Sequence, residues 1–145
     1  MIVVDTNIIS YLFLSGERSE QSEHLLSANA HWAAPLLWRS EFRSVLGQYL
    51  RKKLLDFRQC LEIVHQAEAL MTSREYQVSS TQVMKLLSTS ACSAYDCEFV
   101  ALAKDLDRPL ITEDKKILSI FPKIARSVED YLNEPHRDPD LKAKK

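Results

Sequence analysis

The sequence predicts an α/β fold with a central, mostly parallel sheet of four to five strands and helices on both faces. Short apolar runs alternate along the chain with longer segments in which apolar residues recur at helical spacing. The first run, residues 2–4 (IVV), is apolar at every position, which is typical of a strand buried on both faces. With 145 residues, of which 46% are hydrophobic, the chain is long enough for one such domain.

The first part of the chain contributes, after this strand, two helices and one further strand. Thr6 is a favourable cap for a short helix over residues 7–13. Residues 17–27 form the next expected helix, which is polar. Residues 31–34 are expected to form the second strand, which ends at Pro35.

Two long amphipathic helices follow. They are expected at residues 37–53 and 56–71, and Asp56 is the expected cap of the second. In the first helix the apolar positions at helical spacing are Leu37, Phe42, Val45, Leu46, Tyr49 and Leu50. In the second helix they are Phe57, Cys60, Leu61, Val64, Ala67 and Leu70.

The rest of the chain resumes the alternation. Strands are expected at residues 76–78 and 109–112, with a weak edge strand at residues 124–127. Helices are expected at residues 81–87, 94–106, 115–121 and 128–132. Residues 1–133 therefore read as one domain. Residues 134–145, which are polar and include two prolines and four basic residues, are expected to be a flexible tail.

Composition excludes several classes of protein. The only glycines, Gly16 and Gly47, are far apart, so no glycine-rich loop for nucleotide phosphates is present. A formal net charge of −1 argues against a nucleic-acid binder that relies on phosphate neutralisation alone, but it does not exclude a nuclease. The three cysteines give no disulfide framework, and the four histidines lack the spacing of metal ligands.

We expect no secretion signal at the N-terminus, because an expected strand begins at once and an acid stands at position 5. The apolar stretch at residues 8–14 is too short to span a bilayer. We therefore expect a cytoplasmic protein that is not inserted in a membrane.

Four acidic residues fall where a parallel sheet would bring them to one edge. Asp5 directly follows the strand at residues 2–4, and Asp114 follows the strand at residues 109–112. In open α/β sheets the ligand site lies beyond the carboxyl ends of the strands. Glu41 and Asp96 fall near the starts of two expected helices. We expect the four carboxylates to meet.

Carboxylates that meet in this way require a cation. Two unit negative charges about 4 Å apart repel by roughly 4 kcal/mol at an effective dielectric constant near 20. The carboxylates would bind protons unless a divalent cation such as Mg²⁺ or Mn²⁺ kept them ionised. Such an ion can polarise a phosphodiester and activate a water molecule, so no serine, cysteine or histidine nucleophile is needed.

Neighbouring polar residues are candidates for supporting roles. Thr6, Asn7 and Thr112 are placed to donate hydrogen bonds to the carboxylates. The basic residues near the same edge, which are candidates for holding RNA phosphates, are Arg39, Arg43, Lys115 and Lys116.

Each of these residues also has a structural explanation. Asp5 and Asp114 are possible helix caps, Asp96 is a possible dipole partner in a first helical turn, and Glu41 and the basic residues are possible solvated charges.

Four stretches together resemble the PIN-domain ribonucleases, and in particular the toxins of VapBC toxin–antitoxin pairs. The stretches are residues 2–7 (IVVDTN), 35–41 (PLLWRSE) with Val45 and Leu46, 95–103 (YDCEFVALA) and 109–114 (PLITED). The resemblance covers roughly residues 1–132. One position departs from it, since many relatives carry asparagine three residues after the second acid, where this chain has Ser44.

This resemblance implies a three-layer α/β/α sandwich and Mg²⁺- or Mn²⁺-dependent cleavage of RNA. The implied acidic quartet is Asp5, Glu41, Asp96 and Asp114, with Thr112 as the hydroxyl of the family's T-x-D element. The implied assembly is a homodimer that a small antitoxin protein inhibits by blocking the acidic site.

Other functions fit the sequence less well. A haloacid-dehalogenase-type phosphatase needs a second aspartate two residues after the first, and this chain has Asn7 there. A phospho-accepting receiver domain needs an acid pair at the first strand, which ends in Asp5 alone. A PIN-like module that binds RNA or protein without cutting remains the main alternative, and the complete acidic set argues against it.

Overall fold

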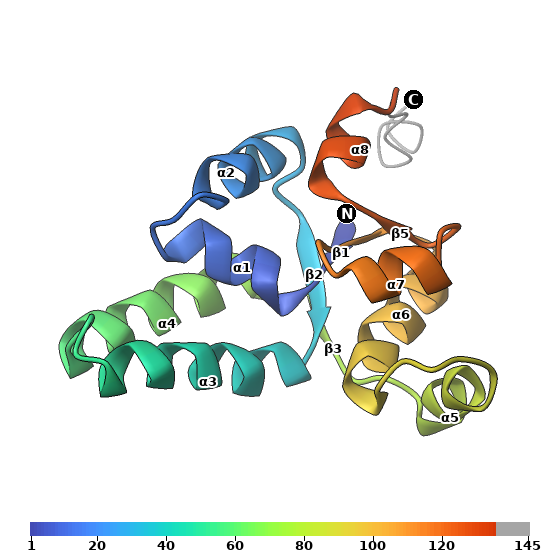
Figure 1. Cartoon of the computed structure of the whole chain (residues 1–145), viewed down its shortest axis with the longest axis horizontal. Helices are drawn as coiled ribbons and strands as arrows, with labels where there is room; N and C mark the ends of the chain where they lie inside the picture. The colour runs from blue at the N-terminus through green and yellow to red at the C-terminus, as the bar shows by residue number, and fades with distance from the viewer. Residues whose placement is uncertain (136–145) are drawn as a thin grey trace.

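The computed structural model describes residues 1–135, and they form a five-stranded, all-parallel sheet between two layers of helices (Figure 1). The strands are β1 (Ile2–Val4), β2 (Trp32–Pro35), β3 (Glu75–Tyr76), β4 (Leu110–Ile111) and β5 (Ala125–Arg126). Their order in the sheet is β3-β2-β1-β4-β5. The predicted α/β/α architecture with a parallel sheet is therefore confirmed.

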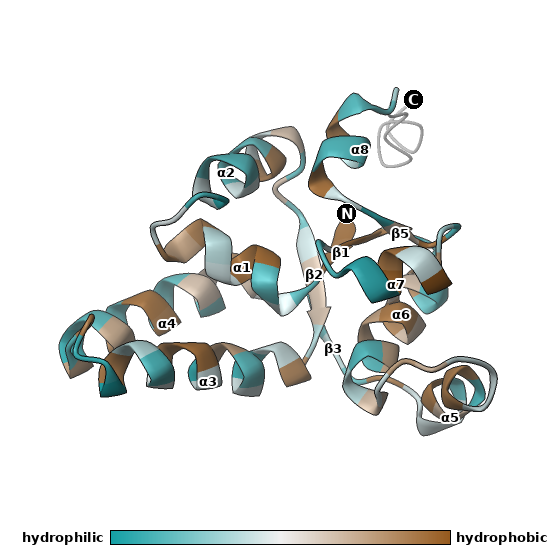
Figure 2. Ribbon diagram, in the orientation of Figure 1, coloured by the Kyte–Doolittle hydropathy of each residue, from teal (hydrophilic) through white to brown (hydrophobic). Residues whose placement is uncertain are grey.

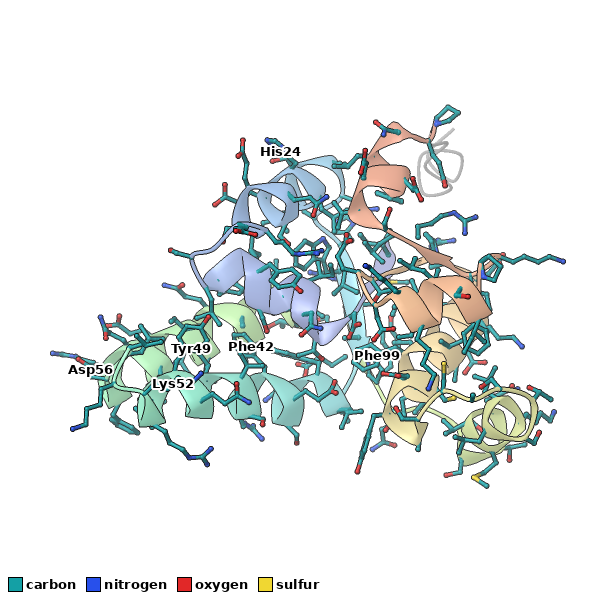
Figure 3. All side chains as sticks on the ribbon, in the orientation of Figure 1. His24, Phe42, Tyr49, Lys52, Asp56 and Phe99 are labelled. Atoms are coloured by element: carbon teal, nitrogen blue, oxygen red, sulfur yellow. The ribbon has the colours of Figure 1, made fainter. Side chains whose placement is uncertain are left out.

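The helices alternate with the strands along the chain. They are α1 (Thr6–Phe13), α2 (Ser19–Ala28), α3 (Leu37–Arg51), α4 (Phe57–Met71), α5 (Ser80–Thr89), α6 (Ala94–Leu106), α7 (Lys115–Ile120) and α8 (Val128–Asn133). Figure 1 shows α1 to α4 on one side of the sheet and α5 to α7 on the other, while α8 packs against α2. Phe42 on α3 and Phe99 on α6, labelled in Figure 3, mark these two layers.

The central strand β1 determines where a site can form. It pairs with β2 on one side and with β4 on the other, and its three residues are buried. The chain runs from β1 to β2 and β3 in one direction and returns to β4 and β5 on the opposite side. Strand order therefore reverses between β1 and β4. A crevice beyond the carboxyl ends of the strands at such a switch point is the usual ligand site of open α/β sheets.

The interior is apolar and includes both tryptophans. Trp32 and Trp38 are almost fully buried, and the Trp38 ring lies 5.8 Å from the Phe42 ring between centroids. Figure 2 shows apolar residues on the ribbons that face the sheet and polar residues mostly on the outer turns. All three cysteines are buried free thiols, in agreement with the expectation that they form no disulfide framework.

Two local predictions were wrong. The third strand is Glu75–Tyr76 rather than residues 76–78, because its partner β2 ends at Pro35, which pairs with Tyr76. Thr6 does not cap α1. Asp5 occupies the N-cap position without a side-chain capping bond, and Thr6 is the first helical residue. The hydroxyl of Thr6 is thereby released for another partner.

The last helix of the described residues, α8, ends at Asn133. Glu134 is the C-cap residue of α8, and its Oε1 accepts a hydrogen bond of 2.8 Å from Arg126 Nε. The greater part of the predicted tail, residues 136–145, lies outside the described residues. Among residues 1–135, the helices are too short or too polar to cross a bilayer.

Candidate active site

One buried hydroxyl group links the side chain of Asp5 to the backbone of Asp114 at the switch point. Thr112, which follows β4 and is fully buried, donates from Oγ1 to Asp5 Oδ2 at 2.8 Å. The same oxygen accepts a hydrogen bond of 3.0 Å from the backbone N–H of Asp114. The Thr112 hydroxyl therefore connects the Asp5 carboxylate after β1 with the Asp114 backbone after β4.

Asp114 also begins a helix. Its Oδ1 accepts a hydrogen bond of 3.0 Å from the backbone N–H of Ile117, so it is the N-cap of α7. The capping role and a role in the site do not compete, because a carboxylate has two oxygens and the cap uses one of them.

Helix α3 brings Glu41 to the same crevice. The hydroxyl of Thr6 on α1 donates to Glu41 Oε1 at 2.7 Å. Short bonds of this kind are typical of hydroxyl groups that donate to ionised carboxylates. The residue expected to cap α1 thus orients an acid that lies 35 positions further along the chain.

Asp96 comes from the first turn of α6, which packs against β1, β2 and β4. The cap of this helix is Ser93, whose Oγ accepts a hydrogen bond of 3.1 Å from the backbone N–H of Asp96. The cap fixes the start of the helix and therefore the position of the acid. The half-buried carboxylate faces the charges of the other acids.

Asp5, Glu41 and Asp96 have raised pKa values, in part because of the charges of neighbouring acids. Burial, and then the charges of Glu41 and Asp96, raise the pKa of Asp5 from 3.8 to about 6, although the Thr112 hydrogen bond opposes the shift. Burial and the charge of Asp96 raise the pKa of Glu41. Burial and the charge of Asp114 raise the pKa of Asp96. All four acids therefore belong to one electrostatic cluster.

Such a cluster fits a hard divalent cation. Its donor atoms are carboxylate oxygens, which Mg²⁺ and Mn²⁺ prefer, and a cation would offset the repulsion that disfavours the charged form of Asp5. Within residues 1–135, no three carboxylate, imidazole or thiol groups are close enough to enclose an ion by themselves. Mg²⁺ usually takes one or two carboxylates directly and keeps several water molecules, so a more open arrangement suits it.

Glu113, next to Asp114, takes no part in the cluster. Its Oε1 accepts a hydrogen bond of 3.0 Å from the backbone N–H of Val128, and its Oε2 lies 3.2 Å from Arg18 Nη1. The side chain thus points toward α8 and the loop before α2, as expected for a residue next to an inward-pointing one.

One carboxylate near the site is not apparent in the sequence. Glu98, on α6, is half-buried, and its charge raises the pKa of Glu41. Burial also raises its own pKa. The signal in the sequence is weak, because Glu98 is two positions from Asp96 and therefore falls on a different face of the helix.

Three of the residues expected to support the site are exposed. Asn7 is exposed on the first turn of α1, as are Lys115 and Lys116 on α7. The positive charge of Lys116 acts on Asp96, whose pKa it lowers, so this lysine lies near the acids.

Arg39 and Arg43, which both lie on α3, also differ. Arg43 is exposed, with one nitrogen 3.9 Å from Glu68. Arg39 is bound by two glutamates, Glu68 and Glu75, which occupy its guanidinium group. Of these two side chains, only Arg43 is left accessible to a phosphate.

We expect Thr112→Val to destabilise the protein by about 1–3 kcal/mol. The substitution keeps the shape of the side chain but leaves Asp5 without its donor and the Asp114 N–H without its acceptor. Urea unfolding of the metal-free protein measures the change. Thr72→Val is the matched control, because the exposed Thr72 hydroxyl bonds only to a carbonyl of its own helix. Equal stability of the two variants would contradict the bridging role of Thr112.

The chain is similar to known proteins over most of its length. The sequence profile of the PIN domain matches residues 2–126. Ribonuclease VapC3 from Pyrobaculum aerophilum is 27% identical over 136 residues, which cover 85% of this chain and 96% of the relative.

Solved structures show the same fold. A toxin–antitoxin complex from Klebsiella pneumoniae contains a chain with 18% identity and a TM-score of 0.69, covering 88% of this chain and 98% of its own. The crystal structure of PAE2754 from Pyrobaculum aerophilum has 17% identity and a TM-score of 0.71, covering 90% and 92%. Since the profile spans most of the chain, including all five strands and the four acids, the chain belongs to the PIN domain family.

Proposed function

We propose that this PIN domain is a metal-dependent endoribonuclease. The observation that carries the proposal is the cluster of four interacting carboxylates, Asp5, Glu41, Asp96 and Asp114, at the switch point of the sheet. A relative of nearly the same length is named a ribonuclease, which supports RNA as the substrate.

The proposed chemistry is hydrolysis of a phosphodiester bond. Mg²⁺ or Mn²⁺ held by the carboxylates would polarise a phosphodiester oxygen and lower the pKa of the attacking water molecule. The protein's own contribution is to hold the acids ionised and correctly oriented. Thr112 and Thr6 do so through hydrogen bonds to Asp5 and Glu41, and we assign a similar supporting role to Asn7.

Exposed basic residues on both sides of the crevice would hold the RNA backbone. We propose this role for Arg43 on α3 and for Lys115 and Lys116 on α7, because they are exposed and Lys116 lies near Asp96. The contribution of each is expected to weaken at high salt, because it arises from phosphate neutralisation.

Incubation with defined RNAs tests this function. Transfer, ribosomal and messenger RNAs are incubated with Mg²⁺, with Mn²⁺ or with a chelator, and the ends of the products are mapped. We expect discrete internal cuts that require the metal. A protein that binds these RNAs without cutting any of them, with either metal, would instead be a non-catalytic PIN module.

We further propose that the chain is the toxin of a toxin–antitoxin pair. A solved structure with the same fold is described as a toxin–antitoxin complex. As expected from the family, we propose that the chain acts as a homodimer in the cytoplasm. Light scattering of the purified protein tests the homodimer, which should have twice the mass of one chain.

An exposed apolar surface supports a protein partner. Of the seven large hydrophobic side chains that are exposed among residues 1–135, four lie on the hairpin of α3 and α4, and we call these four the hairpin patch: Leu50, Leu54, Phe57 and Leu61. Clustered exposed apolar side chains of this kind mark interaction sites more often than single ones do. The neighbouring basic residues are Arg51, Lys52, Lys53 and Arg58. This combination fits an acidic, amphipathic segment of a small antitoxin.

The turn that carries the patch is well defined. Lys53 has a left-handed backbone with φ of 58°, and the N–H of Leu54 donates to the carbonyl of Tyr49 at 2.9 Å. Asp56 caps α4, as predicted, through a reciprocal pair of bonds with Gln59. The backbone of the turn is therefore fixed by its own hydrogen bonds. Figure 3 labels Tyr49, Lys52 and Asp56 at this free end of the hairpin.

We expect Leu54→Ser and Phe57→Ser to abolish association with the antitoxin and to leave RNA cleavage unchanged. The tagged chain is purified from its native host, and the proteins that elute with it are identified by mass spectrometry. Met84→Ser, at an exposed position on α5, is the control. Purification of the wild-type chain without any small partner would argue against the toxin assignment while leaving the nuclease untouched.

A further inference from the structure

The guanidinium group of Arg39 joins three elements of the fold. Its Nε donates to Glu75 Oε2 at 2.6 Å and its Nη2 donates to Glu75 Oε1 at 2.7 Å, so the pair with β3 is bidentate. Its Nη1 donates to Glu68 Oε1 on α4 at 3.0 Å. The indole Nε1 of Trp38 donates to the same Glu75 oxygen at 3.0 Å. We call these four residues the Arg39 clamp.

Helix α3 begins without a side-chain cap. The N-cap position of α3 is Leu36, which has no side-chain acceptor for the first N–H groups of the helix. Instead, the start of the helix is fixed from outside. The N–H of Leu36 donates to the carbonyl of Tyr76 on β3 at 3.0 Å, and Trp38 and Arg39 both bind Glu75 on the same strand.

The ion pair between Arg39 and Glu75 is strong enough to fix the start of α3. Two parallel charge-assisted bonds define both direction and distance. They raise the pKa of Arg39 and lower that of Glu75, which in both cases favours the charged form. The side chain of Glu75 is 12% exposed and that of Arg39 is 35% exposed, so the carboxylate is the more shielded partner of the pair.

Arg39 and Glu41 point in different directions from the same turn of α3. Two positions correspond to about 200° of rotation around an α-helix. Arg39 faces β3 and α4, and Glu41 faces the Thr6 hydroxyl on α1. A rotation or shift of the helix at Arg39 would therefore move the Glu41 carboxylate away from its partner.

We propose that Arg39 is a positioning residue for the acidic site: its bidentate pair with Glu75 sets the rotation of α3 and so places the Glu41 carboxylate for binding a divalent cation. This inference rests on the proposed function in one respect, namely that Glu41 contributes to ion binding. It replaces the expected role of Arg39 as a phosphate-binding residue. The clamp acts through Glu41 and does not contact the ion or the RNA.

Calorimetric titration with Mn²⁺ tests the proposal without any cleavage assay. We expect Arg39→Met to weaken Mn²⁺ binding about tenfold, the lower end of the range for residues that orient metal ligands. Arg39→Lys should weaken it as well, because lysine keeps the charge but cannot form two parallel bonds. Gln48→Met is the control on the same helix, because Gln48 is exposed and lies seven positions after Glu41. It should change the affinity by less than about twofold.

A second set of variants separates positioning from general stability. In a Glu41→Gln background, Arg39→Met should have almost no further effect on Mn²⁺ affinity, because the ligand through which it acts is already altered. An equal loss in both backgrounds, or no loss in either, overturns the inference. If Arg39→Met does not fold, Glu75→Gln can be used for the same test. This substitution keeps an acceptor for Trp38 and removes the charge that pairs with Arg39.

The outcomes also separate this inference from the proposed function. A wild-type chain that binds Mn²⁺ and cuts no RNA would disprove the nuclease, and the clamp would still be tested by the titrations. A wild-type chain that binds no Mn²⁺ overturns the inference together with the metal site.

Discussion

Replacing Asp5 by asparagine should reduce RNA cleavage by at least about 10²- to 10³-fold, the range for removing one preorganised electrostatic contact with a transition state. Asp5 is held by the Thr112 hydroxyl and feels the charges of Glu41 and Asp96. Asparagine keeps the shape and one acceptor oxygen but removes the negative charge. Cleavage rates at saturating Mg²⁺ or Mn²⁺ measure the loss, and Asp96→Asn should behave alike.

The neighbouring Glu113 offers a matched control for this result. It is next to Asp114, but its carboxylate bonds to Val128 and Arg18 instead of facing the cluster. Glu113→Gln should therefore cut RNA at nearly the normal rate. Circular dichroism and thermal unfolding check that each variant is folded. An Asp5→Asn variant that cuts at the wild-type rate would refute the role of this acid and would weaken the nuclease proposal as a whole.

Much of this site is predictable from the sequence because it depends on strand ends. A buried apolar strand that is followed directly by an acid places that acid at the carboxyl edge of the sheet. This argument applies to Asp5 after β1 and to Asp114 after β4, and the two strands are neighbours. It also holds for Thr112, since the residue that ends a strand has few directions in which it can point.

Other features depend on contacts between distant residues and are not encoded in local patterns. The hydroxyl of Thr6 could cap α1 or reach a distant acid, and only the packing of α3 against α1 decides between them. Arg39 looks like a solvated charge in an amphipathic helix, because nothing in the sequence indicates that Glu75 will lie beside it. Glu98 is overlooked for the same reason, since its relation to Glu41 depends on how two helices pack.

Element boundaries show a similar limit. The two long helices were predicted to within two residues at either end, because their apolar periodicity is strong. The short strand β3 was displaced by one residue at its start and ended two residues earlier, because its limits come from its partner. A two-residue edge strand has too little sequence of its own to define where it begins.

The same Asp5→Asn substitution that removes activity should stabilise the metal-free protein above about pH 6. The pKa of Asp5 in the folded protein is about 6, well above its ordinary value of 3.8, so the folded state binds this proton more tightly than the unfolded state does. A group with a raised pKa favours folding at pH values below its unfolded pKa, and this contribution is lost as the pH rises through the folded pKa. Above about pH 6 the charged carboxylate destabilises the fold by an amount of the order of 3 kcal/mol.

Asparagine carries no such penalty, so the variant should gain about 1–3 kcal/mol over the wild type near pH 7.5 and almost nothing near pH 4. Urea unfolding in the presence of a chelator at the two pH values measures the difference. Asp105→Asn, which removes an exposed carboxylate from α6, is the control and should show little change at either pH.

Added Mn²⁺ should reverse the order of stability. An ion that binds only the folded wild type stabilises it in proportion to the logarithm of its concentration, and the variant should gain much less. A wild-type protein that remains less stable than Asp5→Asn at saturating Mn²⁺ would contradict the assignment of Asp5 to a cation site. If Asp5→Asn instead destabilised the metal-free protein at neutral pH, this result would contradict the claim that the charged Asp5 carboxylate destabilises the fold. The expected reversal links the repulsion among these acids directly to their function, because the ion that removes the repulsion is the one that the proposed cleavage requires.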